Sequence, residues 1–312
     1  MMEKYITMTM TVGVIVPTLN AGHEWSEWLK SMFAQTLKPA RILIIDSSSD
    51  DSTAELSRMA GCEVIVIARE DFNHGTTRKM GASLLSNMDI LVYMTQDAFF
   101  SNVYALEELI RPFCDPEVSA TYGRQLPHHK AGYVGAHARI FNYPDRSTVR
   151  NISNARELGI KVAFISNSFS AYRRIMLNMV GSFPEDNIFG EDTYVAAKLL
   201  IANKKIGYVA NAQVYHSHDY SYREDFRRCF DIGVFHSRES WILREFGRAE
   251  GEGRKFVFSE LKFLLKNAPW LIPDSIIRNF FKYVGYKLGS CEKRLSHSLK
   301  IRLSMHRRYW GK

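Results

Sequence analysis

Short apolar runs alternate with longer amphipathic stretches over the first hundred residues of the chain. Strands are predicted where β-branched residues cluster, at residues 12–16, 42–45, 64–67 and 90–94. Helices are predicted between them, one with Trp25, Trp28, Leu29, Met32 and Phe33 on its apolar face, one after the Ser/Asp cluster at 48–51, and one near 76–85. This rhythm is typical of a doubly wound, mostly parallel sheet covered by helices, an α/β fold. Residues 48–51 offer side-chain acceptors to the first N–H groups of the second helix.

The pattern becomes mixed after residue 160. It predicts strands at 162–165 and 206–215, helices at 174–180 and 192–202, and a loop at 183–190. Beyond Tyr222 the apolar period is helical, and Pro269 and Pro273 divide it into segments. We therefore expect an α/β catalytic domain at residues 1–222 and a helical region at 223–312.

Composition places the 312 residues among ordinary globular proteins, with 46% hydrophobic and 24% charged residues. The four cysteines, at positions 62, 114, 229 and 291, are too far apart for a CxxC site and too few for a disulfide framework, which favours a reduced cytosolic setting. No window approaches the ~18 apolar residues of a membrane-spanning helix, so we expect a cytoplasmic protein that is soluble or peripheral.

Positive charge is concentrated at the C-terminal end. Residues 253–312 contain 14 Lys and Arg but only Glu260, Asp274 and Glu292, a net +11, whereas the whole chain carries +8 and residues 1–252 therefore −3. Aromatic and aliphatic residues are interleaved with these cations. This combination favours an anionic membrane surface, with a helix packed on the catalytic domain as the open alternative, and it argues against nucleic acid as the partner.

Two acids end predicted strands at the same edge of the sheet. Asp97 follows the strand at 90–94, and Asp46 ends the strand at 42–45. Ligands bind at this edge in open α/β sheets, and a carboxylate is a suitable ligand for Mg²⁺ or Mn²⁺. Each Asp taken alone is equally compatible with a turn residue. The chain has neither GxGxxG nor GxxxxGK[ST], which excludes dinucleotide-binding and P-loop folds.

Four blocks in order resemble inverting glycosyltransferases of family 2, which have the GT-A fold: VIVPTLN at 14–20, IIDSSSDDST at 44–53, TQDA at 95–98 and GED at 190–192. Two further blocks, FNHGTTR at 72–78 and YHSHDYS at 215–221, look most like bacterial rhamnosyltransferases of O-antigen and surface-polysaccharide assembly. The resemblance implies dTDP-L-rhamnose as donor, a polyprenyl-diphosphate-linked saccharide as acceptor, and work at the inner face of the cytoplasmic membrane. A UDP-hexose donor on the same fold, or a scaffold without catalysis, are the alternatives.

The resemblance also assigns roles to individual residues. Asp97 holds the divalent ion, with His216 as a further ligand and His218 as a candidate, although two histidines so close are also common at a strand end. Donor binding falls to Pro17, Thr18, Asn20, Asp46, Arg78 and Gln96, and Gln96 stands where many relatives have a second acid. Asp192 is the expected base, and Glu191 orients the acceptor or shares that role.

Overall fold

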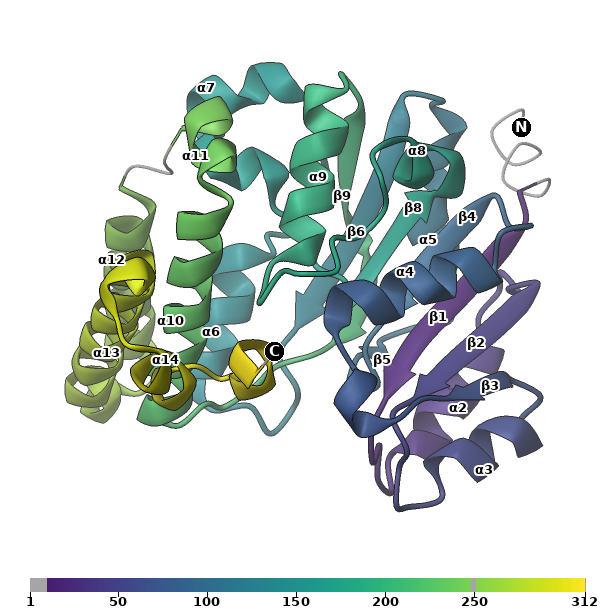
Figure 1. Cartoon of the computed structure of the whole chain (residues 1–312), viewed down its shortest axis with the longest axis horizontal. Helices are drawn as coiled ribbons and strands as arrows, with labels where there is room; N and C mark the ends of the chain where they lie inside the picture. Colours follow the sequence, from purple (N-terminus) through teal and green to yellow (C-terminus); the bar gives the residue numbers. More distant parts are fainter. Residues whose placement is uncertain (1–9, 248–250, 312) are drawn as a thin grey trace.

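The computed structural model describes residues 10–247 and 251–311, so Lys312, one of the tail cations, lies outside them (Figure 1). The described residues form a nine-stranded sheet in the order β3-β2-β1-β4-β8-β6-β9-β5, with β7 paired to β9. The strands are β1 Val12–Thr18, β2 Arg41–Asp46, β3 Glu63–Val66, β4 Ile90–Met94, β5 Phe99–Phe100, β6 Val118–Leu126, β7 Thr148–Arg150, β8 Phe169–Arg173 and β9 Lys205–Tyr215. The pairings run β1, β2, β3, β4, β6 and β9 in one direction and β5, β7 and β8 in the other.

The predicted α/β architecture is confirmed in the first hundred residues. Helices α2 Trp25–Phe33, α3 Thr53–Met59 and α4 His74–Leu84 connect the parallel strands β1 to β4. The predicted cap is present in part, since Asp51 Oδ1 accepts from the Thr53 N–H at 3.0 Å at the start of α3. The remaining helices before the C-terminal region are α5 Ala105–Ile110, α6 Tyr133–Asn142, α7 Ala155–Leu158, α8 Arg174–Met179 and α9 Glu191–Ile201.

Apolar side chains fill both faces of the sheet. On one face Val14, Val16 and Val92 pack with Trp25 and Trp28 of α2, whose indole rings stack 4.6 Å apart. Neighbouring strand residues point to the opposite face, where the core includes residues of α4, α9 and the C-terminal helices. Because successive side chains alternate across a strand, a run that is apolar throughout must be buried on both faces, as the sequence predicted.

The predicted strand at 162–165 is wrong. Residues Gly159–Ala163 form a 3-10 turn, and the strand of this region is β8, a few residues later. Val162, Ala163 and Ile165 are buried apolar residues. An apolar run of four residues is too short for its period to distinguish a strand from a buried turn.

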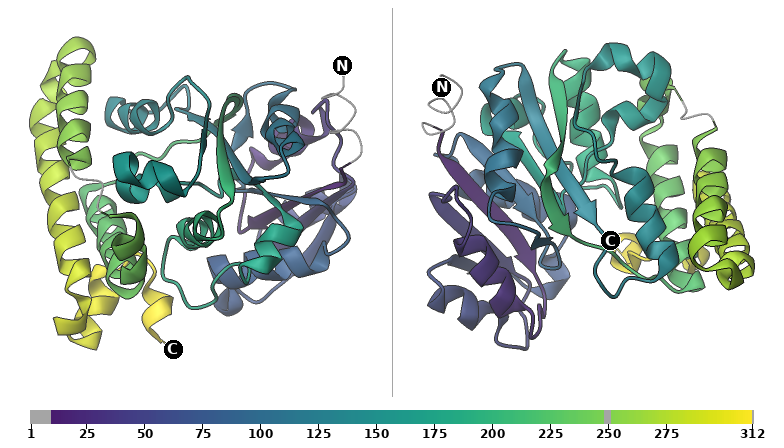
Figure 2. Two further views of the ribbon diagram at one scale, coloured as in Figure 1. Left: turned by 90° about the horizontal axis from the view of Figure 1, so that it is seen from above. Right: turned by 180° about the vertical axis from the view of Figure 1, so that it is seen from behind.

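Helices α10 Tyr222–Arg238, α11 Ser240–Phe246, α12 Glu252–Asn267, α13 Ile272–Ser290 and α14 His297–Leu303 form the C-terminal region. Pro269 opens the short turn between α12 and α13, whereas Pro273 lies in the first turn of α13, where a missing N–H costs little. Figure 2 shows α12 and α13 as an outer layer, on the far side of α10 from the sheet. No helix in the described ranges is both long and apolar enough to cross a bilayer.

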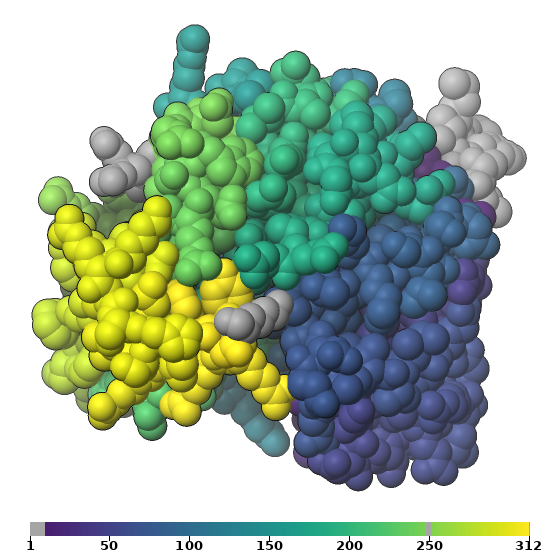
Figure 3. Space-filling view, in the orientation of Figure 1, coloured from purple at the N-terminus to yellow at the C-terminus, as the bar shows by residue number. Residues whose placement is uncertain are grey.

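The last residues of the chain return to the N-terminal half. Figure 3 shows this segment, in yellow, lying against the blue surface formed by earlier residues. Arg308 Nη1 donates to the backbone oxygen of Arg69 at 2.6 Å, and the Tyr309 hydroxyl donates to that of Asp186 at 3.0 Å. The C-terminal segment is thus fixed against the loops around residues 69 and 186.

Candidate active site

Asp97, His216 and His218 meet at the edge of the sheet, and strand pairing explains why. Antiparallel β5 and β9 pair Phe99 with Tyr215, so the residues just before Phe99 face those just after Tyr215. Nε2 of His216 lies 3.4 Å from Asp97 Oδ1, and Nε2 of His218 lies 3.6 Å from Asp97 Oδ2. One ligand atom from each residue falls within 4.8 Å of the others, close enough to bind a single ion.

The His216 ring is oriented by a hydrogen bond on its far side. Its Nδ1 lies 2.9 Å from Gln125 Oε1, an acceptor only, so Nδ1 carries a hydrogen and Nε2 is the ring nitrogen turned towards Asp97. Gln125 is fixed in turn, because its Nε2 donates to Ser166 Oγ at 2.9 Å and Arg139 donates to its Oε1. These contacts orient the ring before any ion arrives.

His218 is neutral near pH 7. Burial, and then the neighbouring His216, lower its pKa to about 4. Its ring stacks on Tyr220 with centroids 5.2 Å apart and packs edge-on against His216. The pKa of Asp97 ends far below its ordinary value, because contacts with His216 outweigh the opposing effect of burial. The cluster therefore offers one carboxylate and two imidazoles, a donor set that fits a divalent ion.

The predicted acids lie at the N-terminus of α9. Gly190 precedes them with a φ of 71°, a conformation that favours glycine, and a Cβ there would meet the Phe235 ring at 3.0 Å. Glu191 is buried and its Oε1 is 2.5 Å from Nη1 of Arg78. Asp192 is half-buried and accepts from the backbone N–H groups of Thr193 at 2.7 Å and Asn167 at 3.3 Å.

The two carboxyl groups have opposite pKa shifts. Burial raises the pKa of Asp192 to about 7, and the neighbouring Glu191 charge adds to that rise. Burial acts in the same direction on Glu191, but Arg78 and His74 outweigh it and leave its pKa below the ordinary value. Because their pKa values differ in this way, Asp192 is able to exchange a proton near neutral pH while Glu191 stays charged.

Asn167 connects the acids to each other. Its side-chain nitrogen lies 3.4 Å from Glu191 Oε1, and its oxygen accepts from Ser170 and from the Tyr172 hydroxyl at 2.7 Å. Its neighbour in sequence, Ser166, contacts Gln125. Residues 166 and 167 thus link the metal cluster and the acids within two positions of the chain.

The predicted residues of the first loops contact one another. Asp46 is buried and accepts from Thr18 Oγ1 at 2.9 Å, from Ser49 Oγ at 2.6 Å and from the Ser49 N–H at 2.8 Å. Asn20 has a φ of 47°, and its Oδ1 accepts from the Asp50 N–H. Asp46 therefore closes the turn after β2, and its role in donor binding stays a prediction.

Gln96 joins two loops of the same edge. Its amide accepts from the Leu19 N–H at 2.7 Å and donates to the Leu19 oxygen at 3.0 Å. Pro17 stands inside β1, paired with Ile45, two residues before this contact. Gln96, which stands where many relatives have a second acid, thus forms hydrogen bonds with the loop after β1. Donor binding by Pro17 and Gln96 stays a prediction.

Arg78 does not face solvent. It is 4% exposed on α4, and its ion pair with Glu191 is the contact that the structure gives its guanidinium. The donor-binding role that the sequence predicts for Arg78, for example on a phosphate, would require that pair to open. Its burial favours a positioning role for the acid loop.

Arg228 of α10 is a cation that the sequence patterns did not single out. Its guanidinium carbon lies 5.1 Å from the centre of the Phe189 ring and 6.0 Å from that of Tyr220. Phe189 precedes the acids, and Tyr220 stacks on the metal-cluster residue His218. Arg228 has no ion pair with another described residue, and it sits between the two halves of the site.

Comparison with known proteins identifies the family of this chain. Residues 13–181 match the family described as Glycosyl transferase family 2. The chain is 46% identical over 96% of its length to the O-antigen chain rhamnosyltransferase WbaN of Salmonella anatum, covering 95% of that protein, and 43% identical over 97% to RfbN of Salmonella typhimurium, covering 96%. Among solved structures, the mannosyltransferase PcManGT from Pyrobaculum calidifontis, in complex with GDP-Man and Mn²⁺, superposes with a TM-score of 0.56 at 16% identity, over 96% of this chain and 85% of that one. The predicted GT-A fold is confirmed.

Proposed function

This chain belongs to glycosyltransferase family 2, and on that premise we propose that it transfers L-rhamnose from dTDP-L-rhamnose to a polyprenyl-diphosphate-linked saccharide in O-antigen chain assembly. The supporting observation is near-complete coverage at 46% identity by an O-antigen chain rhamnosyltransferase. Asn167 contacts the acids and its neighbour Ser166 contacts Gln125 of the metal cluster, and this linked arrangement argues for an enzyme rather than a scaffold.

Asp97, His216 and His218 would hold the divalent ion of the donor complex. Two imidazoles favour Mn²⁺ over Mg²⁺, which prefers oxygen ligands. When bound, the ion neutralises charge on the departing diphosphate. Arg228 would add a second positive charge, because it lies between the metal cluster and the acid loop and has no ion pair within residues 10–247 and 251–311.

Asp192 would act as the base that takes the proton from the acceptor hydroxyl. Its pKa of about 7 leaves it ionised at slightly alkaline pH, and it is basic enough to accept a proton there. Asn167 and Thr193 orient its carboxylate through backbone N–H groups, while Arg78 and Glu191 form the ion pair beneath it. Attack on the face opposite the leaving group converts a β-linked donor into an α-rhamnoside.

Calorimetry of nucleotide binding tests the donor. With Mn²⁺ present we expect dTDP to bind more tightly than UDP, and dTDP binding to weaken when the ion is chelated. If UDP bound at least as tightly as dTDP, a UDP-hexose would replace dTDP-L-rhamnose as the donor.

A further inference from the structure

Helix α13 buries small residues and exposes large apolar side chains. Its buried positions include Ser275, Gly285 and Gly289. A Cβ at Gly289 would stand 2.0 Å from the backbone oxygen of Phe230, and one at Gly285 2.3 Å from that of Phe226. Only glycine permits this close approach of α13 to α10. A helix that packs through small residues leaves its bulky ones to face outward.

The outward side chains of α12, of the following turn and of α13 form what we call the apolar face. Phe258 and Leu265 lie one above the other on α12, and on α13 the spacing of residues 276, 280 and 283 forms one stripe. Relative exposure ranges from 45% to 72% across its seven members, Phe258, Leu265, Trp270, Ile276, Ile277, Phe280 and Tyr283. A large exposed apolar patch on a folded protein marks a binding surface.

Cations surround this face without acids among them. Arg254, Lys262, Lys266 and Lys287 are exposed and have no ion pair with a described residue. The acids of the same two helices are already engaged: Glu252 with Lys161 and Lys255, Glu260 with Ser275 and Asn279, and Asp274 with Tyr222 and Arg278. The outer surface is therefore apolar and positive, and its complement is apolar and negative.

We propose that the apolar face and its cations dock the enzyme on an anionic lipid bilayer, with the aromatic side chains inserted among the headgroups. Aromatic rings with polar edges and lysines with long apolar stems are suited to this interface. The inference rests on the proposed function in one respect, because a lipid-linked acceptor is what gives docking its purpose.

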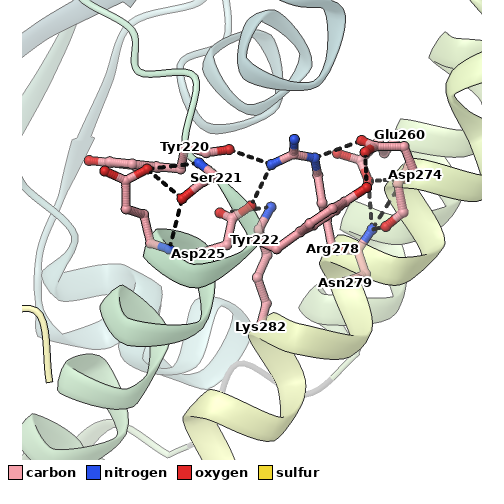
Figure 4. A network of polar contacts seen from close by, with 11 residues as sticks. Tyr220, Ser221, Tyr222, Asp225, Glu260, Asp274, Arg278, Asn279 and Lys282 are labelled. Atoms are coloured by element: carbon pink, nitrogen blue, oxygen red, sulfur yellow. Dashed lines mark hydrogen bonds and ion pairs between the residues drawn. The ribbon is translucent and has the colours of Figure 1, made fainter. Parts of the chain in front are cut away.

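A polar network fixes the docking helices relative to the site (Figure 4). Arg278 of α13 donates to the backbone oxygen of Tyr220 and lies 3.1 Å from Asp225 Oδ2, and its guanidinium covers the Tyr222 ring at 4.7 Å. Tyr220 stacks on His218 of the metal cluster. Glu260 of α12 accepts from Ser275 and from Asn279 at 2.6 Å. Docking through α12 and α13 thereby sets the orientation of the metal cluster relative to the bilayer.

Sedimentation of the full chain with sucrose-loaded vesicles tests the docking. We expect binding to phosphatidylglycerol/phosphatidylethanolamine vesicles that weakens with added salt, and little binding to phosphatidylcholine. Phe258→Ser/Phe280→Ser and Lys262→Gln/Lys266→Gln should each reduce partitioning by ~10-fold or more. Met59→Ser/Ile175→Ser removes two apolar side chains of similar exposure, 77% and 62%, that lie outside the face, and should bind as the parent does.

Trp270 offers a second, spectroscopic readout. It is 69% exposed, whereas Trp25, Trp28 and Trp310 are buried. Its insertion should shift tryptophan emission to shorter wavelength when anionic vesicles are added. Trp270→Phe should keep vesicle binding but lose the shift, because phenylalanine preserves the apolar contact.

Two sedimentation results would overturn the proposal: equal recovery of the protein with anionic and neutral vesicles, or equal vesicle binding by the face variants and the control variant. A dimer that the same face substitutions dissociate would also overturn it, because a second copy of the chain would then cover the apolar face. Binding of dTDP with Mn²⁺ is measured on the same samples. If the protein binds dTDP but does not bind vesicles, docking alone is rejected. If it binds vesicles but does not bind dTDP, the proposed function alone is rejected.

Discussion

Replacement of Asp192 by asparagine should make the protein inactive and, near neutral pH, more stable. The side chain keeps its size but can no longer take a proton from the acceptor, so kcat should fall by ~10²–10⁴-fold with donor affinity nearly unchanged. The stability effect arises because the folded protein holds this carboxylate in surroundings that disfavour its charge. An amide has no such charge.

The sign and size follow from the pKa shift. An unfolded aspartate ionises near its ordinary pKa of 3.8, whereas Asp192 in the folded protein keeps its proton up to about pH 7. The parent protein therefore loses stability as the pH rises between these values, by ~4 kcal/mol at most above both. The amide places an NH₂ against either Asn167 N–H or Thr193 N–H, which loses one hydrogen bond of ~1 kcal/mol. Allowing also for solvent access to the half-buried side chain, we expect a net gain of ~1–2 kcal/mol near pH 8.

Urea unfolding of the parent and of Asp192→Asn at about pH 5.5 and about pH 8 measures this directly. The advantage of the variant should grow with pH and level off above about pH 7, and in the parent kcat/KM should rise over the same range as the base ionises. A variant that is less stable than the parent at both pH values would show that the charge of Asp192 is not disfavoured, and a variant that turns over normally would show that Asp192 is not the base.

Four other substitutions test the remaining parts of the site. Asp97→Ala should abolish tight Mn²⁺ binding in calorimetry and make the weaker binding of dTDP independent of the ion. Gln125→Leu should lower Mn²⁺ affinity by ~10–100-fold, because His216 loses the acceptor that fixes its tautomer; an unchanged affinity would remove Gln125 from the site. Arg78→Met should lower the free energy of unfolding by ~3–5 kcal/mol by leaving Glu191 charged and buried, and Glu191→Gln in that background should restore much of it; a large loss of dTDP affinity with little loss of stability would instead support a phosphate role. Arg228→Met should weaken dTDP binding in Mn²⁺ by ~10-fold or more if its charge meets the diphosphate, and equal binding would exclude that contact.

Much of the sheet could be predicted because its strands are apolar throughout and end in polar turns. This change, just after β4, made Asp97 a candidate ligand, and the resemblance to the family then gave it its expected role. Sequence distance conceals the metal cluster, because Asp97 lies far from His216 in the chain. Only the resemblance to the family predicted that the two residues share a site. The pairing of β5 with β9 that joins them involves a two-residue strand with no readable period.

The polar supports of the site had no sequence signal. Gln125 and Asn167 matter through one hydrogen bond each to a functional side chain, and neither residue type has a spacing that points to such a contact. Arg78 has a contact that is equally hidden in the sequence, since only tertiary packing shows that Glu191 lies against it, and its role in donor binding stays a prediction. The strand predicted at 162–165 failed because burial alone does not specify backbone conformation.

The most direct test of the proposed reaction is the product formed from a panel of nucleotide sugars. The purified chain, Mn²⁺ and a polyprenyl-diphosphate-linked oligosaccharide are incubated with dTDP-L-rhamnose or with UDP-hexoses, and the product is analysed by mass spectrometry and by NMR of its anomeric proton. We predict transfer from dTDP-L-rhamnose and an α-linked rhamnose. Turnover of a UDP-hexose in its place, or a β-linked rhamnose, would contradict the donor or the inverting mechanism respectively.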